Sequence, residues 1–363
     1  MQLTEAATER TGPDYGRSVN GLDFLWLELT DKCNLACVHC YADSSPLLPL
    51  FQGMQLADWK RVLAESREAG CRKVQFIGGE PAIYPHLIEL IQYSRALGYE
   101  LVEVFTNGTA FTEAIRDAFG QCNVSLAFSA YGGNASIHDS VTLRAGSFSK
   151  TVQSVEWALK TGLAVRVAIV ETSRNSEAIE ATRSFFEALG VSEVRVDRTR
   201  GVGRGSIAGD VTSAFDELCG GCWQGKLCVA PTGDMFPCVF SRSWIVGTAA
   251  EGVKAALEGR RLLDFRSTLR QKLLEDAVNC IPAHRGPEPD EPEPCNPERS
   301  MDALPRHYPA YEKKCLPEDE ERCIPARRTS APARTYQDRG KCAPVCERCL
   351  PIKHTGGPEN SYL

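Results

Sequence analysis

The sequence alternates short β-type runs with amphipathic helical stretches from Phe24 to about Gly205. This alternation is typical of a parallel sheet with helical crossovers. Six strand–helix repeats are fewer than the eight of a closed barrel, so we predict an α/β fold, a partial TIM-type (β/α)6 barrel with functional loops at the carboxyl ends of its strands. We expect strands at 24–29, 73–77, 100–105, 123–128, 164–170 and 193–197, and helices at roughly 55–69, 85–97, 110–119, 148–161 and 176–189.

The composition changes after Gly205, and it changes sharply from Cys280 onward. The last 84 residues hold 14 of the 21 prolines and 7 of the 16 cysteines. A proline-rich segment forms few helices or ladders, so ligation of metal by cysteine is the expected source of order there. We therefore divide the chain into an N-terminal extension at 1–22, a barrel domain at 23–210, and a small cysteine-rich, mostly irregular C-terminal domain at 211–363.

Charge and hydropathy exclude several classes of partner. A net charge of −6 argues against a protein that neutralises nucleic-acid phosphates. The sequence has no apolar run long enough to span a bilayer, and its polar start lacks the hydrophobic core of a signal peptide. We therefore expect no nucleic-acid or membrane partner and a cytoplasmic location. Thiols stay reduced in the cytoplasm, so metal ligation is the leading use of the sixteen cysteines.

Three cysteines follow the first expected strand in a C-x3-C-x2-C spacing: Cys33, Cys37 and Cys40. Three thiolates this close together can ligate three of the four irons of a cubane iron–sulfur cluster, which leaves the fourth iron open for another ligand. A zinc site is the alternative, but zinc favours two pairs of ligands and nothing nearby supplies a second pair. We interpret His39, inside this loop, as a packing or hydrogen-bonding residue.

This loop resembles the cluster motif of the radical S-adenosylmethionine (SAM) superfamily, in which an aromatic residue such as Tyr41 follows the last cysteine. The resemblance implies a [4Fe-4S] cluster whose open iron is chelated by the amino and carboxylate groups of SAM. It also implies that an electron from the reduced cluster cleaves the sulfonium bond. The products are methionine and a 5′-deoxyadenosyl radical.

The ends of the later strands carry the residues that the resemblance assigns to SAM. Two glycines at the end of the second strand let the backbone approach a ligand closely, although a simple glycine turn closed by proline is the alternative. The resemblance implies that this motif meets the methionyl ammonium group, with Glu80 accepting hydrogen bonds from that ammonium or from a lysine. The full set of expected SAM-binding residues is Tyr41, Gly78, Gly79, Glu80, Pro81, Thr106, Asn107, Ser129 and Arg144.

Three features near the last strands complete the expected pocket. Ser129 matches a family serine that contacts the ribose or carboxylate of SAM, whereas Arg144 matches its arginine loosely. We interpret His138 and Asp139 as structural, because a polar pair at a loop–helix junction usually caps the helix. A glycine-rich turn at 200–205 is expected near the adenine side of the pocket.

A second group of cysteines begins after the barrel, with Gly233 and Cys238 in a G-x4-C spacing. The glycine predicts a tight hairpin that brings the cysteines at its two ends together. This arrangement resembles the start of the SPASM or twitch extension, which holds auxiliary iron–sulfur clusters in radical SAM enzymes. A zinc ribbon is the alternative. The expected auxiliary ligands are Cys219, Cys222, Cys228, Cys238, Cys342, Cys346 and Cys349, with Cys280, Cys295, Cys315 and Cys323 left open. We expect Cys71 and Cys122 to be buried small hydrophobes.

The resemblances together imply an enzyme that removes a substrate hydrogen and carries one or two auxiliary clusters. The leading substrate is a ribosomal precursor peptide, modified by cross-linking, epimerisation or oxidation. A radical dehydrogenase or epimerase acting on a small molecule such as an aminosugar is the alternative, and an iron–sulfur electron carrier or zinc scaffold is a more distant one.

The same resemblances imply two kinds of partner. The enzyme needs an electron donor such as flavodoxin or ferredoxin. Only about 20 residues precede the first strand, so binding of a leader peptide would need a separate protein or another surface. No pair of residues stands out as a catalytic acid and base.

Overall fold

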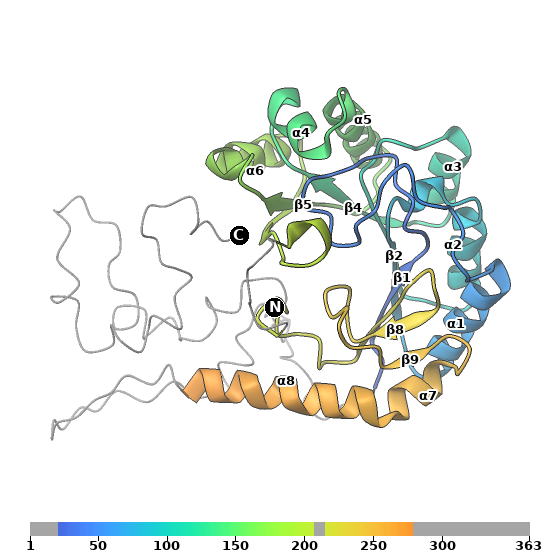
Figure 1. The fold of residues 1–363 in the computed structure, drawn as a ribbon. Coiled ribbons are helices and arrows are strands. Elements are labelled where there is room, and N and C mark those ends of the chain that lie inside the picture. The colour runs from blue at the N-terminus through green and yellow to red at the C-terminus, as the bar shows by residue number, and fades with distance from the viewer. Residues whose placement is uncertain (1–20, 207–214, 279–363) are drawn as a thin grey trace, which may run out of the picture.

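A computed structural model describes residues 21–206 and 215–278 (Figure 1). Its strands form one sheet in the order β6-β5-β4-β3-β2-β1-β7-β8-β9. The first six pair in parallel in the order of the chain, which confirms the partial (β/α)6 barrel. Their bounds are β1 Phe24–Glu28, β2 Lys73–Ile77, β3 Leu101–Thr106, β4 Ser125–Ala130, β5 Val165–Glu171 and β6 Glu193–Arg198.

Helices lie outside these strands and cover the convex face of the sheet (Figure 1). Among the helices of the barrel, α4 is the one that the sequence did not predict, and it begins where Asn134 Oδ1 accepts a hydrogen bond from the Ile137 amide at 3.0 Å. The helices of the barrel are α1 Leu56–Glu68, α2 Leu87–Ala96, α3 Glu113–Gln121, α4 Ala135–Thr142, α5 Ser147–Lys160 and α6 Ile179–Ala188. Single 3₁₀ turns are η1 Pro81–Ile83, η2 Ser176–Ala178 and η3 Gly203–Gly205.

The core lies between the strands and these helices. Leu25 and Leu27 of β1 are fully buried in it, as the period of two along a strand requires. The opposite face of the sheet is polar in places, since Arg166 of β5 donates to both carboxylate oxygens of Glu103 in β3, at 2.9 and 2.8 Å. Of the two cysteines expected to be buried, Cys71 is fully buried and Cys122 is half-buried.

The sheet continues into the cysteine-rich region. Strand β7, Lys226–Val229, pairs in parallel with β1, so β1 has neighbours on both edges. Gly233, with φ of +91°, turns the chain into β8, Asp234–Phe236, which pairs antiparallel with β7 as the predicted hairpin requires. The region ends with β9 Gly247–Thr248, α7 Val253–Glu258 and the long α8 Arg260–Val278 (Figure 1).

This part of the C-terminal region is therefore more regular than the sequence predicted, because its strands complete an existing sheet. The division of the chain into domains stays a prediction. None of the described helices combines the length and apolar character needed to cross a bilayer.

Candidate functional site

The first three cysteines lie together on the loop that follows β1. Cys33 is buried, and Cys37 and Cys40 are half-buried. Burial raises the pKa of Cys33, and the nearby thiols of Cys37 and Cys40 add to that shift. Burial also raises the pKa of Cys37 to about 12. The three predicted ligands are therefore close enough to influence one another, and a metal that binds must displace the protons of Cys33 and Cys37.

The two glycines after β2 admit the backbone of this loop. The Gly79 amide donates to the Thr30 carbonyl at 2.6 Å, and the Glu80 amide donates to the Lys32 carbonyl at 3.0 Å. A Cβ atom on Gly79 would lie 2.1 Å from the Lys32 oxygen, and one on Gly78, whose φ is +126°, would lie 2.7 Å from the Thr30 oxygen. The sequence explained these glycines by the approach of a ligand, but the close approach in the structure is made by the chain itself.

Glu80 is fully buried and joins the ends of β2 and β3. Its Oε1 accepts hydrogen bonds from the Thr106 hydroxyl at 2.6 Å and from the Ala82 amide at 3.0 Å, and its Oε2 accepts one from the Asn107 amide at 2.8 Å. Pro81 begins the 3₁₀ turn that follows. Three donors of the chain therefore occupy the carboxylate, and direct contact of Glu80 with SAM stays a prediction.

Asn107 lies beside the cysteine loop. Its Nδ2 donates to Asn34 Oδ1 at 2.9 Å and is 3.7 Å from Cys33 Sγ. The Asn107 carbonyl accepts a hydrogen bond from the Thr151 hydroxyl of α5 at 2.7 Å. The end of β3 is thus fixed between a helix and the loop that carries the thiols.

Tyr131, at the end of β4, is a neighbour of the thiols that the sequence did not predict. Its side chain interacts with those of Ser129 and Cys37, so the predicted Ser129 is linked to the cysteine loop through Tyr131. The ring lies 4.8 Å from that of His39 and 5.4 Å from that of His138, between centroids. His39 therefore packs, as expected. The one sequence feature that could have indicated Tyr131 is its position, an aromatic residue two positions after Ser129.

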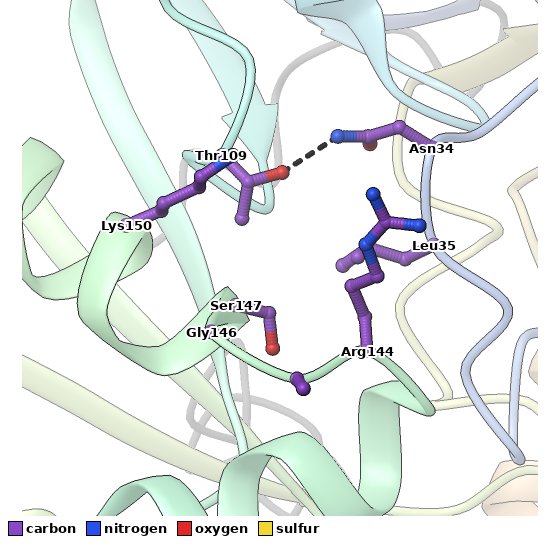
Figure 2. Close-up of a pocket in the computed structure, with 8 residues that line it drawn as sticks. Asn34, Leu35, Thr109, Arg144, Gly146, Ser147 and Lys150 are labelled. Carbon is purple, nitrogen blue, oxygen red and sulfur yellow. Dashed lines mark hydrogen bonds between the residues drawn. The ribbon is translucent and has the colours of Figure 1, made fainter.

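Arg144 lies next to the same loop, in a small cavity of about 60 Å³. Figure 2 shows its guanidinium pointing toward Asn34, whose Nδ2 donates to the Thr109 hydroxyl at 2.7 Å. The cavity is lined by Asn34, Leu35, Thr109, Arg144, Ala145, Gly146, Ser147 and Lys150. A positive charge beside Asn34 and Leu35 suits an anionic group, and the loosely matched Arg144 is in position to supply it.

His138 and Asp139 are structural in this arrangement. Asp139 accepts hydrogen bonds from the Gly146 and Phe148 amides at 2.7 and 2.8 Å, which caps the start of α5. His138 is buried, and its Nδ1 accepts a hydrogen bond from the Tyr131 amide at 3.4 Å. The pair orders the segment that contains Arg144.

Tyr41 contacts residues of the C-terminal extension. Its ring packs edge-on against Phe240 at 5.5 Å, and the guanidinium of Arg242 lies 5.5 Å from its centroid. Arg242 also donates to the buried Glu28 of β1 at 2.5 Å. Tyr41 therefore connects the cysteine loop with the extension, and its contact with SAM stays a prediction.

The second cysteine group is also buried and close together. Cys222 Sγ lies 2.9 Å from Cys238 Sγ, and Cys222 is also hydrogen-bonded to Cys219. That hydrogen bond lowers the pKa of Cys219, and the charges of Lys226 and Arg200 lower it further against the effect of burial. The surrounding apolar side chains are Leu218, Trp223, Phe265, Leu269 and Leu273.

Cys228 belongs to a different apolar cluster, with Ile77 and Phe236, and burial together with the nearby charge of Glu28 raises the pKa of its thiol. The structure therefore brings three of the four predicted ligands of this region together. The remaining predicted ligands, Cys342, Cys346 and Cys349, and the open positions Cys280, Cys295, Cys315 and Cys323 lie outside the described residues.

A single metal ion and an iron–sulfur cluster require different arrangements of their ligands. Within residues 21–206 and 215–278, no three His, Cys, Asp or Glu side chains lie close enough together to hold one metal ion. A four-iron cluster distributes its thiolates over different irons, so its ligands need not meet at one point. The donor sets, three thiols in each group, are of the kind such clusters use.

Several known proteins are similar in sequence to part of this chain. The Radical SAM superfamily model matches residues 27–185. The AdoMet-dependent heme synthase of Methanosarcina barkeri is 30% identical over 188 residues, which cover 52% of this chain and 53% of that protein. The subtilosin biosynthesis protein AlbA of Bacillus subtilis is 27% identical over 180 residues, covering 49% and 40%. The chain therefore spans about half the length of the curated relatives it matches.

A solved structure has the same fold. The crystal structure of Streptococcus suis SuiB bound to precursor peptide SuiA superposes with a TM-score of 0.58, at 14% identity, over 68% of this chain and 67% of that one. This similarity supports the partial-barrel architecture.

Proposed function

We propose that the chain is an enzyme that cleaves SAM reductively and removes a hydrogen atom from its substrate, because residues 27–185 match the Radical SAM superfamily model. The observation that carries the proposal is the grouping of Cys33, Cys37 and Cys40 on one loop after β1. A [4Fe-4S] cluster bound by these thiols would supply the electron that splits SAM into methionine and the 5′-deoxyadenosyl radical.

The chain's own residues would place SAM and keep water away. Arg144 would attract the SAM carboxylate, and Ser129 would orient the same part of SAM together with its neighbour Tyr131. Gly79 and Glu80 would act by fixing the loop and the end of β3. The auxiliary thiols Cys219, Cys222 and Cys238 would hold a second cluster. The further ligands would be Cys228 and the later cysteines Cys342, Cys346 and Cys349.

The substrate that we propose is a ribosomal precursor peptide. Two names support this choice: AlbA is a bacteriocin biosynthesis protein, and the structure of similar fold contains the precursor peptide SuiA. An electron donor such as flavodoxin or ferredoxin, and a separate protein that binds the leader peptide, would complete the system in the cytoplasm. The modification would be a cross-link, an epimerisation or an oxidation.

A small-molecule substrate is the second candidate. The relative that favours it is named as a heme synthase and is 30% identical over 188 residues. A radical dehydrogenase or epimerase with such a substrate would use the same thiols and the same SAM pocket.

Anaerobic reconstitution followed by mass spectrometry tests the proposal. Reduced protein with SAM is expected to form 5′-deoxyadenosine even without a substrate, and a fully reconstituted protein that forms none contradicts the enzyme. Incubation with candidate peptides and small molecules then separates the two substrate classes. A loss of two mass units indicates a cross-link or oxidation, and uptake of solvent deuterium indicates epimerisation.

A further inference from the structure

Arg204 lies in the turn after β6 and reaches the cysteine loop after β1, although four strands separate β6 from β1 in the sheet. Its Nε donates to the Cys37 carbonyl at 2.9 Å, and its Nη2 donates to the Ser44 carbonyl at 2.6 Å. Its Nη1 forms an ion pair with Asp43 Oδ1 at 2.9 Å. One planar guanidinium therefore contacts three points of the loop that carries the thiols.

The backbone of the same turn contacts the loop as well. The Arg204 amide donates to the Cys40 carbonyl at 3.0 Å. Gly203 has φ of +60°, and a Cβ atom there would lie 2.4 Å from the Cys40 oxygen and 2.5 Å from the Tyr41 oxygen. The glycine at this position allows the turn to pack this closely. The 200–205 turn, expected from the sequence near the adenine side of the pocket, therefore also supports the cysteine loop.

The segment from Cys37 to Ser44 needs this support, since it contains no helix or strand. Its own hydrogen bonds are few: the Cys40 amide donates to the Cys37 carbonyl at 3.4 Å, the Asp43 amide donates to the Cys40 carbonyl at 3.2 Å, and the Ser44 amide donates to Cys40 Sγ at 3.4 Å. Without Arg204, three carbonyl or carboxylate groups of the loop lose a charged donor. Loop opening then becomes easier.

We propose that Arg204 is a positioning residue that holds Cys37 and Cys40 in the arrangement that accepts the cluster. This role rests on the proposed function for the identity of the ligand, whereas the hydrogen bonds of Arg204 are formed within the chain itself. A guanidinium can satisfy three acceptors in one plane, whereas a lysine ammonium is a single point charge. Geometry, more than charge, is therefore what Arg204 contributes.

Hydrogen exchange of the full chain before reconstitution tests the proposal, with R204Q and R204K as variants. Arg95 offers a matched control, because it donates to the Cys122 and Asn123 carbonyls at 2.8 and 2.6 Å at a site without predicted cluster ligands. R204Q is expected to exchange the amides of residues 37–44 at least about tenfold faster than wild type. R95Q is expected to leave those amides unchanged and to speed exchange near Asn123.

Iron content and the EPR spectrum of the reduced cluster give a second readout. R204Q is expected to hold less iron at the first site and to show a broadened signal, with R204K closer to R204Q than to wild type. The proposal is overturned if R204Q exchanges at the wild-type rate over residues 37–44, if R95Q produces the same change there, or if R204K equals wild type. A wild-type protein that takes up no cluster contradicts the proposed function instead, because the exchange measurement does not depend on iron.

Discussion

The two cysteine groups are ordered by different means. Cys33, Cys37 and Cys40 lie on an irregular loop whose backbone is hydrogen-bonded to the ends of β2 and β6. Cys222 and Cys238 lie in an apolar pocket beneath α8, with their sulfur atoms 2.9 Å apart. Hydrogen bonds from other loops therefore fix the backbone of the first group, whereas apolar packing encloses the second group. The comparison predicts that the two groups respond to different substitutions.

Replacement of single cysteines should give the largest difference. We expect C33A, C37A and C40A each to reduce 5′-deoxyadenosine formation at least a thousandfold, because the open iron needs all three thiolates. C222A and C238A should keep uncoupled SAM cleavage within about tenfold of wild type and lose product formation instead. The measurement is chromatography of anaerobic reactions, and full uncoupled activity in C37A would remove the distinction between the groups.

Substitution of Gly79 tests the backbone support of the first group. G79A places a Cβ atom 2.1 Å from the Lys32 oxygen, so we expect a loss of about 3 kcal/mol in the free energy of unfolding. G120A is the matched control, since a Cβ there meets nothing closer than 3.9 Å, and helix propensity makes it neutral or stabilising. Denaturant titration measures the free energy of unfolding of G79A and G120A. Equal stability of the two variants would show that the loop is not held at this point.

The pH dependence of stability distinguishes the barrel from residues 215–278, because the barrel contains the buried His138. Burial lowers the pKa of His138 from 6.5 to about 4, and residues 215–278 contain no histidine. The unfolded chain therefore binds a proton at a higher pH than the folded chain does, so stability is lost as pH falls from about 6.5 toward 4. Between pH 7 and pH 5 we expect wild type to lose about 1–2 kcal/mol more than H138Q. Parallel curves for the two proteins would contradict this assignment.

The smallest effect is expected at the cap of α5. D139A removes the acceptor of the Gly146 and Phe148 amides and should cost about 1 kcal/mol. D264A, in the second region, removes an exposed ion pair with Arg260 and should cost less than about 0.5 kcal/mol. Thermal unfolding of both variants measures the difference, and a larger loss for D264A would reverse the expected order.

The sequence predicted the barrel well because its strands and helices carry their own periodic patterns. It also identified Gly78, Gly79 and Glu80 as important, but it could not reveal that their partners are Thr30, Lys32 and Asn107. Those contacts join loops far apart in the chain, and neither periodicity nor spacing encodes which loops meet.

The same limit applies to the residues that the sequence missed. Tyr131 and Arg204 reach the thiols from the ends of β4 and β6, and each is an ordinary polar residue in a loop until the strands are arranged around it. The hairpin after Cys228 was predicted from Gly233, but its pairing with β1 was not, since a parallel partner 200 residues away leaves no local signal.

That pairing has a consequence for synthesis of the protein. β1 emerges from the ribosome first, yet one of its edges is covered by β7, which ends at Val229. A nascent chain that has reached residue 206 has all six barrel strands but exposes the unpaired amides and carbonyls of β1. The interval until β7 is made is thus the period in which the growing chain is most open to association with its neighbours on a polysome.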